Sequence, residues 1–261
     1  MLYTEPYTEE IKNIIIKGCI PEYYNEQLPN HEKIRNIFVN NKKRTGSCSS
    51  YTVPPKVHLT WIGSPLPDKY IPYVNSFVEH NKNTHDIYLW LSHDLSSSDL
   101  EKIPHVIVNN IHDLDLVHKD KIFKDPKSNY SRSNDILSYE LIFLFGGIYC
   151  DIDTMCIKHL DENNFGHSLL TYIDHTYFNI QHAFFAFPKN SEFLEYLISC
   201  IDVCYNEVNY PYSVGPGFIT TGCHAFDDER IRMIKQKFIG SDGSDHSAVF
   251  LQHKLHANWL K

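Results

Sequence analysis

Long apolar runs, paired cysteine motifs and excess positive charge are all missing from this sequence, and each absence excludes a class of protein. The most apolar segment, residues 141–150, is about half the ~20 residues that a membrane-spanning helix needs, so no integral membrane segment is expected. Lys and Arg number 24 against 32 Asp and Glu, a formal net charge of −8 at pH 7. Because such a chain repels phosphate backbones, nucleic acid is excluded as the main partner.

The seven cysteines are an odd number and lack the C-x-x-C spacing of a zinc site or a disulfide framework. Reduced thiols are the simplest interpretation, and they are typical of a cytosol. The first ten residues carry acids where a secretory signal has a basic region and an apolar run, so no signal peptide is expected. These features predict a cytoplasmic protein and leave its oligomeric state open.

The remaining composition, with 42% hydrophobic residues in 261 positions, is enough for one large domain or two small ones. Residues 9–17 and 31–40 have helical spacing, and Pro21 separates them. A polar stretch follows. We therefore expect a helical hairpin with a linker over residues 1–52 and the main domain over residues 53–261.

From residue 53 onward, short β-rich runs alternate with amphipathic helices. The pattern predicts strands at 57–62, 87–91, 106–108, 169–173 and 182–187 and helices at 71–80, 191–205 and 226–238. Such alternation is typical of an α/β domain with a mostly parallel central sheet, which binds ligands at the carboxyl ends of its strands.

The stretch from residue 129 to residue 154 predicts a helix followed directly by a strand. Apolar residues at helical spacing mark one buried helix face: Leu137, Leu141, Leu144 and Phe145. Ser131 or Ser133 is a candidate helix cap. Gly146 and Gly147 allow a left-handed exit from the helix, and a strand at 148–150 then leads to Asp151.

Asp151 and Asp153 form an acidic pair at the end of that strand. Carboxylates at i and i+2 in a regular strand point to the same face, so both can reach one ligand, and oxygen donors suit a hard divalent cation. The spacing alone is not specific, because Asp113 and Asp115 repeat it in an expected loop, where exposed surface acids are the simpler interpretation.

The context of the acidic pair resembles a known family. Five segments carry the likeness, in this order: HLTWIG at 58–63, SNDIL and YE within 133–140, GGIYCDID at 146–153, GPG at 215–217 with Thr220, and His253 followed by Asn258-Trp259. Together they resemble retaining glycosyltransferases with a DXD sugar-binding region. That group includes the yeast initiating α-mannosyltransferase, the capsular and lipopolysaccharide transferases of polysaccharide biosynthesis, and the glycosylating domains of large clostridial toxins.

The resemblance implies a single GT-A domain, Rossmann-like, with an N-terminal helical appendage. It implies a metal-dependent retaining glycosyltransferase that moves a hexose or N-acetylhexosamine from a nucleotide diphosphate sugar. A UDP-sugar is favoured and GDP-mannose is possible as the donor. The acceptor would be a hydroxyl on a glycan, lipid or protein, either in the cell's own cytoplasm or, as for the toxins, in a host cytosol.

The resemblance also implies a role for each matched residue. Trp61 would stack on the nucleotide base and Asp135 would bind hydroxyls of the donor sugar. Asp151 would contact the ribose or a metal-bound water, and Asp153 would ligate Mn²⁺ or Mg²⁺. Asp135, Asp151 and Asp153 are thus the expected catalytic residues.

The later segments would complete the site. Gly215 and Pro216 would lie beside the donor sugar. His253 would join Asp151 and Asp153 at the metal, and Asn258 with Trp259 would belong to a closing segment over the diphosphate.

Three positions depart from the family pattern. Ser138 stands where the family often has Arg, so the positive charge beside the leaving diphosphate would come from another residue, with Arg132 and Lys56 as candidates. Asn258 replaces a Ser, and His182 stands where family members commonly have Asn. These changes would alter donor choice or reduce activity.

Two alternative functions remain open. Asp151-Ile152-Asp153-Thr154 also fits the motif of phosphatases with an aspartyl nucleophile, in which Asp151 attacks phosphorus and Asp153 is the acid/base. Met155 and the position of the motif in mid-chain argue against this. The other alternative, favoured by Ser138, is a catalytically weak protein that binds sugar nucleotides.

Overall fold

The computed structural model describes residues 52–123, 130–174, 178–205, 214–225, 231–235, 239–241 and 250–253. The expected helical hairpin and linker lie almost wholly outside these residues, so the division into 1–52 and 53–261 stays a prediction. Within the described part of the chain no helix is both long and apolar enough to cross a membrane.

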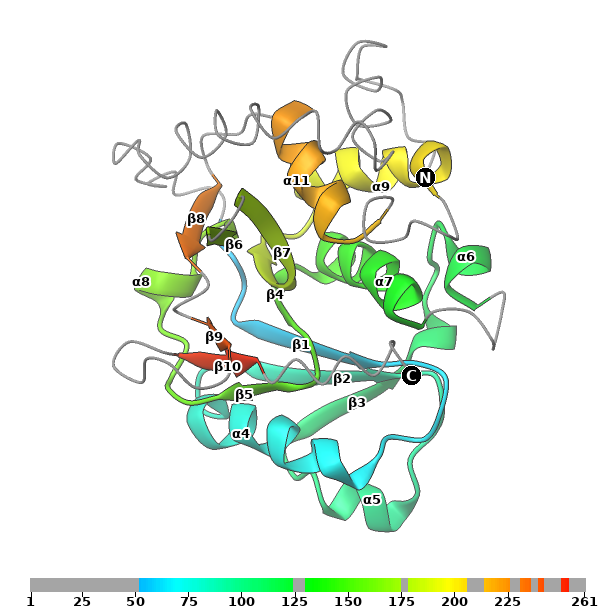
Figure 1. Ribbon diagram of the computed structural model, residues 1–261. Helices are drawn as coiled ribbons and strands as arrows, with labels where there is room; N and C mark the ends of the chain where they lie inside the picture. The colour runs from blue at the N-terminus through cyan, green and yellow to red at the C-terminus, as the bar shows by residue number, and fades with distance from the viewer. Residues whose placement is uncertain are drawn as a thin grey trace.

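A seven-stranded sheet forms the centre of the domain (Figure 1). Its strands, in spatial order, are β3(Val106–Asn110), β2(Asp86–Leu91), β1(Lys56–Trp61), β4(Gly147–Cys150), β7(Phe178–Phe187), β6(Leu169–Asp174) and β8(Arg232–Lys235). β7 runs antiparallel to both of its neighbours, and the other pairs are parallel. The expectation of a mostly parallel α/β sheet is confirmed. A smaller sheet joins β5(Thr154–Cys156), β10(Leu251–His253) and β9(Ile239–Ser241).

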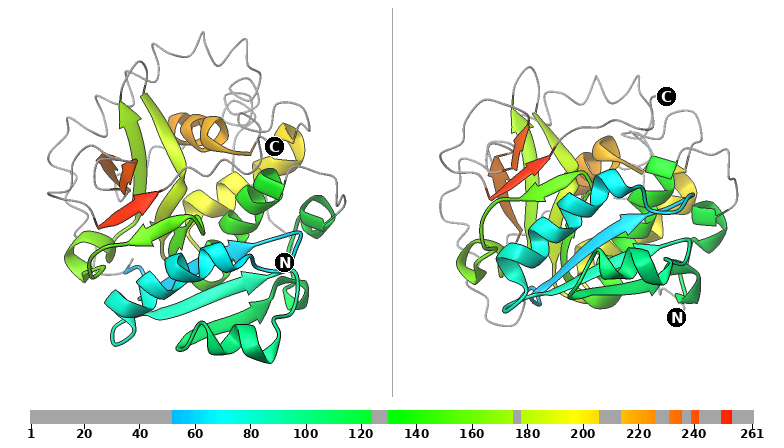
Figure 2. Two further views of the ribbon diagram at one scale, coloured as in Figure 1. Left: turned by 60° about the horizontal axis from the view of Figure 1, so that its bottom comes forward. Right: turned by 90° about the horizontal axis from the view of Figure 1, so that it is seen from below.

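Helices cover both faces of the large sheet (Figures 1 and 2). α7(Tyr130–Phe145), α9(Glu192–Cys204) and α11(Pro216–Ala225) pack on one face, which we call the α7 face. α4(Ile71–Asn81), the small sheet and α8(Glu162–Phe165) pack on the other, the α4 face. Short α5(Ser97–Glu101), α6(Lys119–Phe123) and the 3-10 turns η1(Asp68–Tyr70) and η2(Ile111–Asp113) connect these elements.

Side chains alternate between these two faces along each strand. In β1, Val57 and Leu59 belong to the core on the α4 face, whereas His58 contacts Trp90 of the opposite core. In β4, Ile148 and Cys150 face α4, whereas Tyr149 faces α7. This period of two is what carries every second residue of β1 and β4 toward α7.

Most elements lie where their patterns predicted, and α7 differs in an instructive way. We expected one buried face, but residues from Arg132 to Phe143 are buried almost all round, because the helix lies between the sheet and α9. Leu144 and Phe145 are only partly buried. The expected caps are wrong, since the helix begins at Tyr130 and includes both serines.

The helix expected over residues 226–238 is also wrong. Residues 232–235 form β8, which pairs in parallel with β6. A helix does lie shortly before this segment: α11 begins at Pro216. Pro suits the first helical position, because its missing N–H would have no partner there.

The cysteines that the structure describes are reduced thiols, as expected. Those buried and outside any disulfide are Cys150, Cys156, Cys200, Cys204 and Cys223.

Candidate functional site

Asp151 and Asp153 lie in a turn at the carboxyl edge of the large sheet. β4 ends at Cys150, the amide of Asp151 donates to the Ala183 carbonyl at 3.0 Å, and the amide of Thr154 donates back to the Asp151 carbonyl at 3.0 Å. Ile152 points into the core on the α4 face, and both acids are half-buried. The strand geometry that we expected for the pair is therefore wrong, although its place at the strand end is confirmed.

Two glycines bring α7 and β4 together. Gly146 and Gly147 have φ values of 64° and 122°, which side chains disfavour, so the chain leaves the helix and enters the strand within one residue. A Cβ on Gly147 would lie 2.6 Å from the Lys56 carbonyl oxygen in β1. The reversal returns the chain along α7, so the strand end at Asp151 meets the first turns of the helix.

A chain of hydrogen bonds links β1, α7 and β4 at this edge. Thr60 donates its hydroxyl proton to Asn134 Oδ1. Asn134 Nδ2 donates to the Tyr149 hydroxyl at 2.5 Å, and that hydroxyl donates to Asp151 Oδ1 at 2.8 Å. The carboxylate of Asp151 is thus oriented by three side chains from three elements.

Asp135 takes part in a second network next to the first. Its Oδ1 lies 3.0 Å from His182 Nδ1, and the two side chains are 10% and 4% exposed. Burial raises the pKa of Asp135, the neighbouring Asp151 adds to this, and His182 opposes it. Burial alone would lower the pKa of His182, but Asp135 and Asp151 outweigh it, so the pKa is raised. Burial thus dominates at Asp135, whereas the neighbouring carboxylates dominate at His182.

His182 reaches this position through an irregularity in β7. Leu170 of β6 pairs with Phe185, but the next residue, Thr171, pairs with Gln181, so residues 182–184 bulge out of register. Strict alternation from Phe185 would place residue 183 toward α7 and His182 on the opposite face. The bulge reverses this, which is a common use of bulges near active sites.

Trp61 is the last residue of β1 and is half-buried. Its ring centroid lies 4.9 Å from that of Tyr70, and Nε1 donates to Ser64 Oγ at 3.2 Å. Gly63 follows with φ 96°, and a Cβ there would overlap the Tyr130 ring. Trp61 is thus held at the carboxyl edge of the sheet and remains half-buried.

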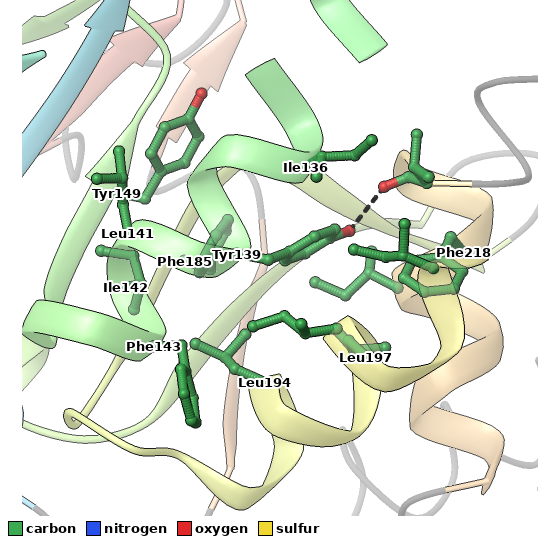
Figure 3. Packing of buried hydrophobic residues seen from close by; sticks show 14 of the residues in the cluster. Ile136, Tyr139, Leu141, Ile142, Phe143, Tyr149, Phe185, Leu194, Leu197 and Phe218 are labelled. Atoms are coloured by element: carbon green, nitrogen blue, oxygen red, sulfur yellow. Dashed lines mark hydrogen bonds between the residues drawn. The ribbon is translucent and has the colours of Figure 1, made fainter. Parts of the chain in front are cut away.

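Gly215 and Pro216 lie at the N-terminus of α11, on the α7 face. The Tyr139 hydroxyl donates to the carbonyl of Val214 at 2.9 Å, which is the dashed bond in Figure 3. Thr220 of α11 accepts from the amide of Ile180 in β7 at 2.9 Å. These bonds attach the start of α11 to the helix of Asp135 and the strand of His182.

The candidates near the C-terminus lie at or beyond the limit of the described residues. The backbone of His253 pairs with Thr154, directly after Asp153, although its side chain is outside the described part. Asn258 and Trp259 also lie outside the described residues.

Of the two candidate cations, Arg132 lies one turn before Asp135, with its guanidinium 5.0 Å from the Tyr205 ring centre. Lys56 begins β1 and lies at the opposite edge of the sheet from Asp151, which argues against its candidacy.

The acidic turn fits a hard cation that keeps most of its ligands outside the protein. The residues described here contain no group of three or more His, Cys, Asp or Glu arranged for a metal. Mg²⁺ and similar ions commonly use one or two carboxylates and complete their shell with water and substrate phosphates. Asp151 and Asp153 have the donor chemistry for such a site.

Sequence reasoning missed the pairing of Asp135 with His182 and the role of Tyr149. Tyr149 could have been found, because it lies at i−2 from Asp151 and shares its face of the strand. His182 could not have been, since the bulge that turns it toward α7 leaves no trace in the hydrophobic pattern.

Comparisons with known proteins now define the class. Residues 67–172 match the family model of the glycosyltransferase sugar-binding region containing the DXD motif. That range includes Asp135, Asp151 and Asp153. Residues 67–172 are therefore similar to the sugar-binding region of DXD glycosyltransferases. No curated protein sequence matches the chain.

Solved structures agree on the fold. The PaToxG glycosyltransferase is similar with a TM-score of 0.53 and 16% identity, over 74% of this chain and 77% of that one. The ligand-free glycosyltransferase domain of the YGT toxin has a TM-score of 0.54 and 10% identity, over 71% and 81%. Its UDP-bound form has a TM-score of 0.53 and 9% identity, over 70% and 80%. The fold is that of the GT-A glycosyltransferases.

Proposed function

We propose that this domain transfers a hexose or N-acetylhexosamine from a nucleotide diphosphate sugar to an acceptor hydroxyl with retention of configuration, and that it requires Mn²⁺ or Mg²⁺. The observation that carries the proposal is the meeting of Asp135 with the acidic turn at Asp151 and Asp153. Two hydrogen-bond networks side by side on α7 hold two of these three carboxylates.

Each carboxylate has a separate task in this proposal. Asp135 accepts hydrogen bonds from hydroxyls of the donor sugar. Asp151 and Asp153 hold the divalent cation, which when bound neutralises charge on the departing diphosphate. Asp151 stays oriented through the Tyr149 hydroxyl. Groups fixed in advance stabilise developing charge more effectively than groups that must reorient.

A UDP-sugar is the favoured donor and GDP-mannose the second choice. One structural neighbour is a glycosyltransferase domain with UDP bound, and Trp61 has the position and exposure to stack on a base. For retention we favour front-face attack, in which the leaving phosphate oxygen takes the acceptor proton, because the sequence singles out no nucleophilic carboxylate beyond the donor site. The acceptor hydroxyl belongs to a glycan, lipid or protein in a cytosol.

The test of this function is the removal of one acidic ligand. Asp153→Asn should lower metal-dependent release of UDP from the best donor by at least about 100-fold, because one charge that holds the cation is lost. The assay uses UDP-hexoses, UDP-N-acetylhexosamines and GDP-mannose with Mn²⁺, and water as acceptor. Chelation of the metal should have the same effect on the unchanged protein.

Asp115→Asn is the matched control, since Asp113 and Asp115 repeat the spacing as exposed acids and should keep full turnover. Equal turnover by Asp153→Asn and Asp115→Asn would contradict the proposal. Nucleotide-sugar binding without hydrolysis or transfer to any acceptor would favour the catalytically weak binding protein. Phosphate release from aryl phosphates, abolished by Asp151→Asn, would favour the phosphatase.

A further inference from the structure

The pairing of His182 with Asp135 extends to a third residue, Ser138. The Ser138 hydroxyl lies 3.1 Å from His182 Nε2, so the imidazole is held from both nitrogens by residues one helical turn apart on α7. His182 itself is 4% exposed. A buried imidazole with both ring nitrogens engaged has a fixed orientation.

Nδ1 of His182 faces a carboxylate oxygen of Asp135, which accepts when ionised, so Nδ1 carries a hydrogen. Ser138 Oγ lies 2.8 Å from the backbone carbonyl of Asp135 and 3.1 Å from His182 Nε2, and it can give its single proton to only one of them. With that proton on the carbonyl, Nε2 donates to Oγ, and the ring is an imidazolium paired with a carboxylate.

The surroundings of His182 are consistent with a buried, paired charge. Its ring lies edge-on to Tyr139 at 4.9 Å and 5.8 Å from the ring of Tyr149. Phe185 covers it at 5.4 Å. The acidic groups that act on it are Asp135 from α7 and Asp151 after β4. An unpaired charge buried among aromatic rings would be costly, so neither partner is expected to be stable in its charged form without the other.

The exposed part of the pair belongs to Asp135. Its side chain keeps 10% of its surface accessible, against 4% for His182, and His182 Nδ1 lies against one of the two carboxylate oxygens, Oδ1. A ligand at the carboxyl edge can therefore reach Asp135 but is kept from His182. The second oxygen of the carboxylate, Oδ2, is the group that such a ligand would meet.

We propose that His182 is a positioning residue for the donor sugar: held by Ser138, its imidazole fixes Oδ1 of Asp135 and so presents Oδ2 to a sugar hydroxyl. This inference rests on the proposed function, because it takes Asp135 as the residue that contacts the sugar. It adds that orientation of the carboxylate comes from a histidine on a neighbouring strand. Loss of His182 should therefore weaken recognition of the sugar and leave recognition of the nucleotide intact.

The first experiment separates these two parts of the donor. Wild type, His182→Asn and His182→Gln are compared for the affinity of UDP with Mn²⁺ and for kcat and KM of UDP release from the best UDP-sugar. We expect kcat/KM to fall by about 10- to 100-fold, as for lost positioning groups elsewhere, with UDP affinity within about twofold of wild type. Wild-type kcat/KM in both variants, or parallel losses of UDP affinity and kcat/KM, would overturn the proposal.

His118→Asn is the matched control for the cost of breaking a buried pair. His118 Nδ1 lies 2.8 Å from Glu140 Oε1, and both side chains are 3% exposed, but the pair lies at the start of α6 and contacts neither Asp135 nor the acidic turn. This variant should lose stability and keep wild-type kcat/KM. If it loses as much kcat/KM as His182→Asn, general loosening explains both and the inference fails.

A second measurement needs no enzymatic activity. Nitrogen NMR of ¹⁵N-histidine-labelled full-length protein, with His182 assigned from the His182→Gln spectrum, should show both ring nitrogens protonated at pH 7. Asp135→Asn should convert the ring to a neutral form. A ring with a bare Nδ1 in wild type would overturn the proposal. If wild type shows the doubly protonated ring but binds no nucleotide sugar, the proposed function fails while the pairing stands.

Discussion

At the scale of single residues, one hydroxyl joins the sheet to the acidic turn. The Tyr149 hydroxyl accepts from Asn134 and donates to Asp151, so it fixes which oxygen of Asp151 remains directed toward a ligand. In Figure 3 the Tyr149 ring lies beside the apolar cluster of α7, with its hydroxyl at the far side from Leu141 and Ile142. The ring thus packs in the core, while the hydroxyl orients Asp151 in the candidate site.

Tyr149→Phe should separate these two roles. We expect the affinity for UDP with Mn²⁺ to fall by about 10-fold, because outer partners of metal ligands have effects of this size, while the melting temperature changes little. Titration calorimetry and thermal unfolding measure the two quantities.

Tyr139→Phe gives the opposite pattern and serves as the control. It removes the hydroxyl that satisfies the buried Val214 carbonyl, so it should cost about 1–3 kcal/mol of stability with UDP affinity largely kept. Unchanged UDP affinity in Tyr149→Phe would contradict the role given to the hydroxyl.

At the scale of elements, the reversal between α7 and β4 determines whether the two networks meet. Gly147→Ala should destabilise the protein by about 2–5 kcal/mol, since it adds left-handed strain and a Cβ against the Lys56 carbonyl. Urea unfolding measures the loss. Ser97→Ala on exposed α5 should stay within about 0.5 kcal/mol, and a similar value for Gly147→Ala would disprove the account of this turn.

Hydrophobic periodicity was sufficient to predict the elements whose packing repeats regularly. The period of two gave β1 and β2, and the helical spacing gave α4 and α9, because each buries one face against the sheet. β8 was misread as a helix since its stability comes from pairing with β6, a partner distant in sequence. The same holds for the candidate site. The acidic pair and Asp135 could be identified from the sequence, whereas the orientation of His182 depends on a bulge that the sequence pattern does not indicate.

At the scale of the whole molecule, two histidines make the protein sensitive to acid. His58 in the core accepts from Trp90 Nε1 at Nδ1, so its hydrogen is on Nε2, which donates to the Gly146 carbonyl at 2.9 Å. Burial lowers the pKa of His58 to about 3. Burial, with His159 nearby, lowers the pKa of His85 to about 4. Both side chains therefore stay neutral in the folded protein at pH values where they are protonated in the unfolded chain.

The free energy of unfolding should decrease as the pH falls from about 6.5 to 5. In this window the unfolded chain takes up protons at His58 and His85 that the folded chain does not, and a fully buried histidine contributes up to about 1.4 kcal/mol per pH unit. His182 opposes this slope near pH 6.5, because its raised pKa keeps it protonated in the folded protein while the unfolded chain is only partly protonated there, and the opposition fades toward pH 5. Urea unfolding at a series of pH values measures the trend, His85→Asn should reduce it, and constant stability from pH 6.5 to 5 would contradict it.

The bulge in β7 has a consequence for how this enzyme can change. Since residues 182–184 are out of register with β6, the side chain at position 182 is released from the alternation that fixes Phe185 and Phe187 in the core. If Asp135 contacts the donor sugar as proposed, a replacement at this position would change the setting of that carboxylate without changing the register of the strand, although it would break a buried pair. Position 182 is therefore where we expect a substitution to alter donor preference from behind the residue that meets the sugar.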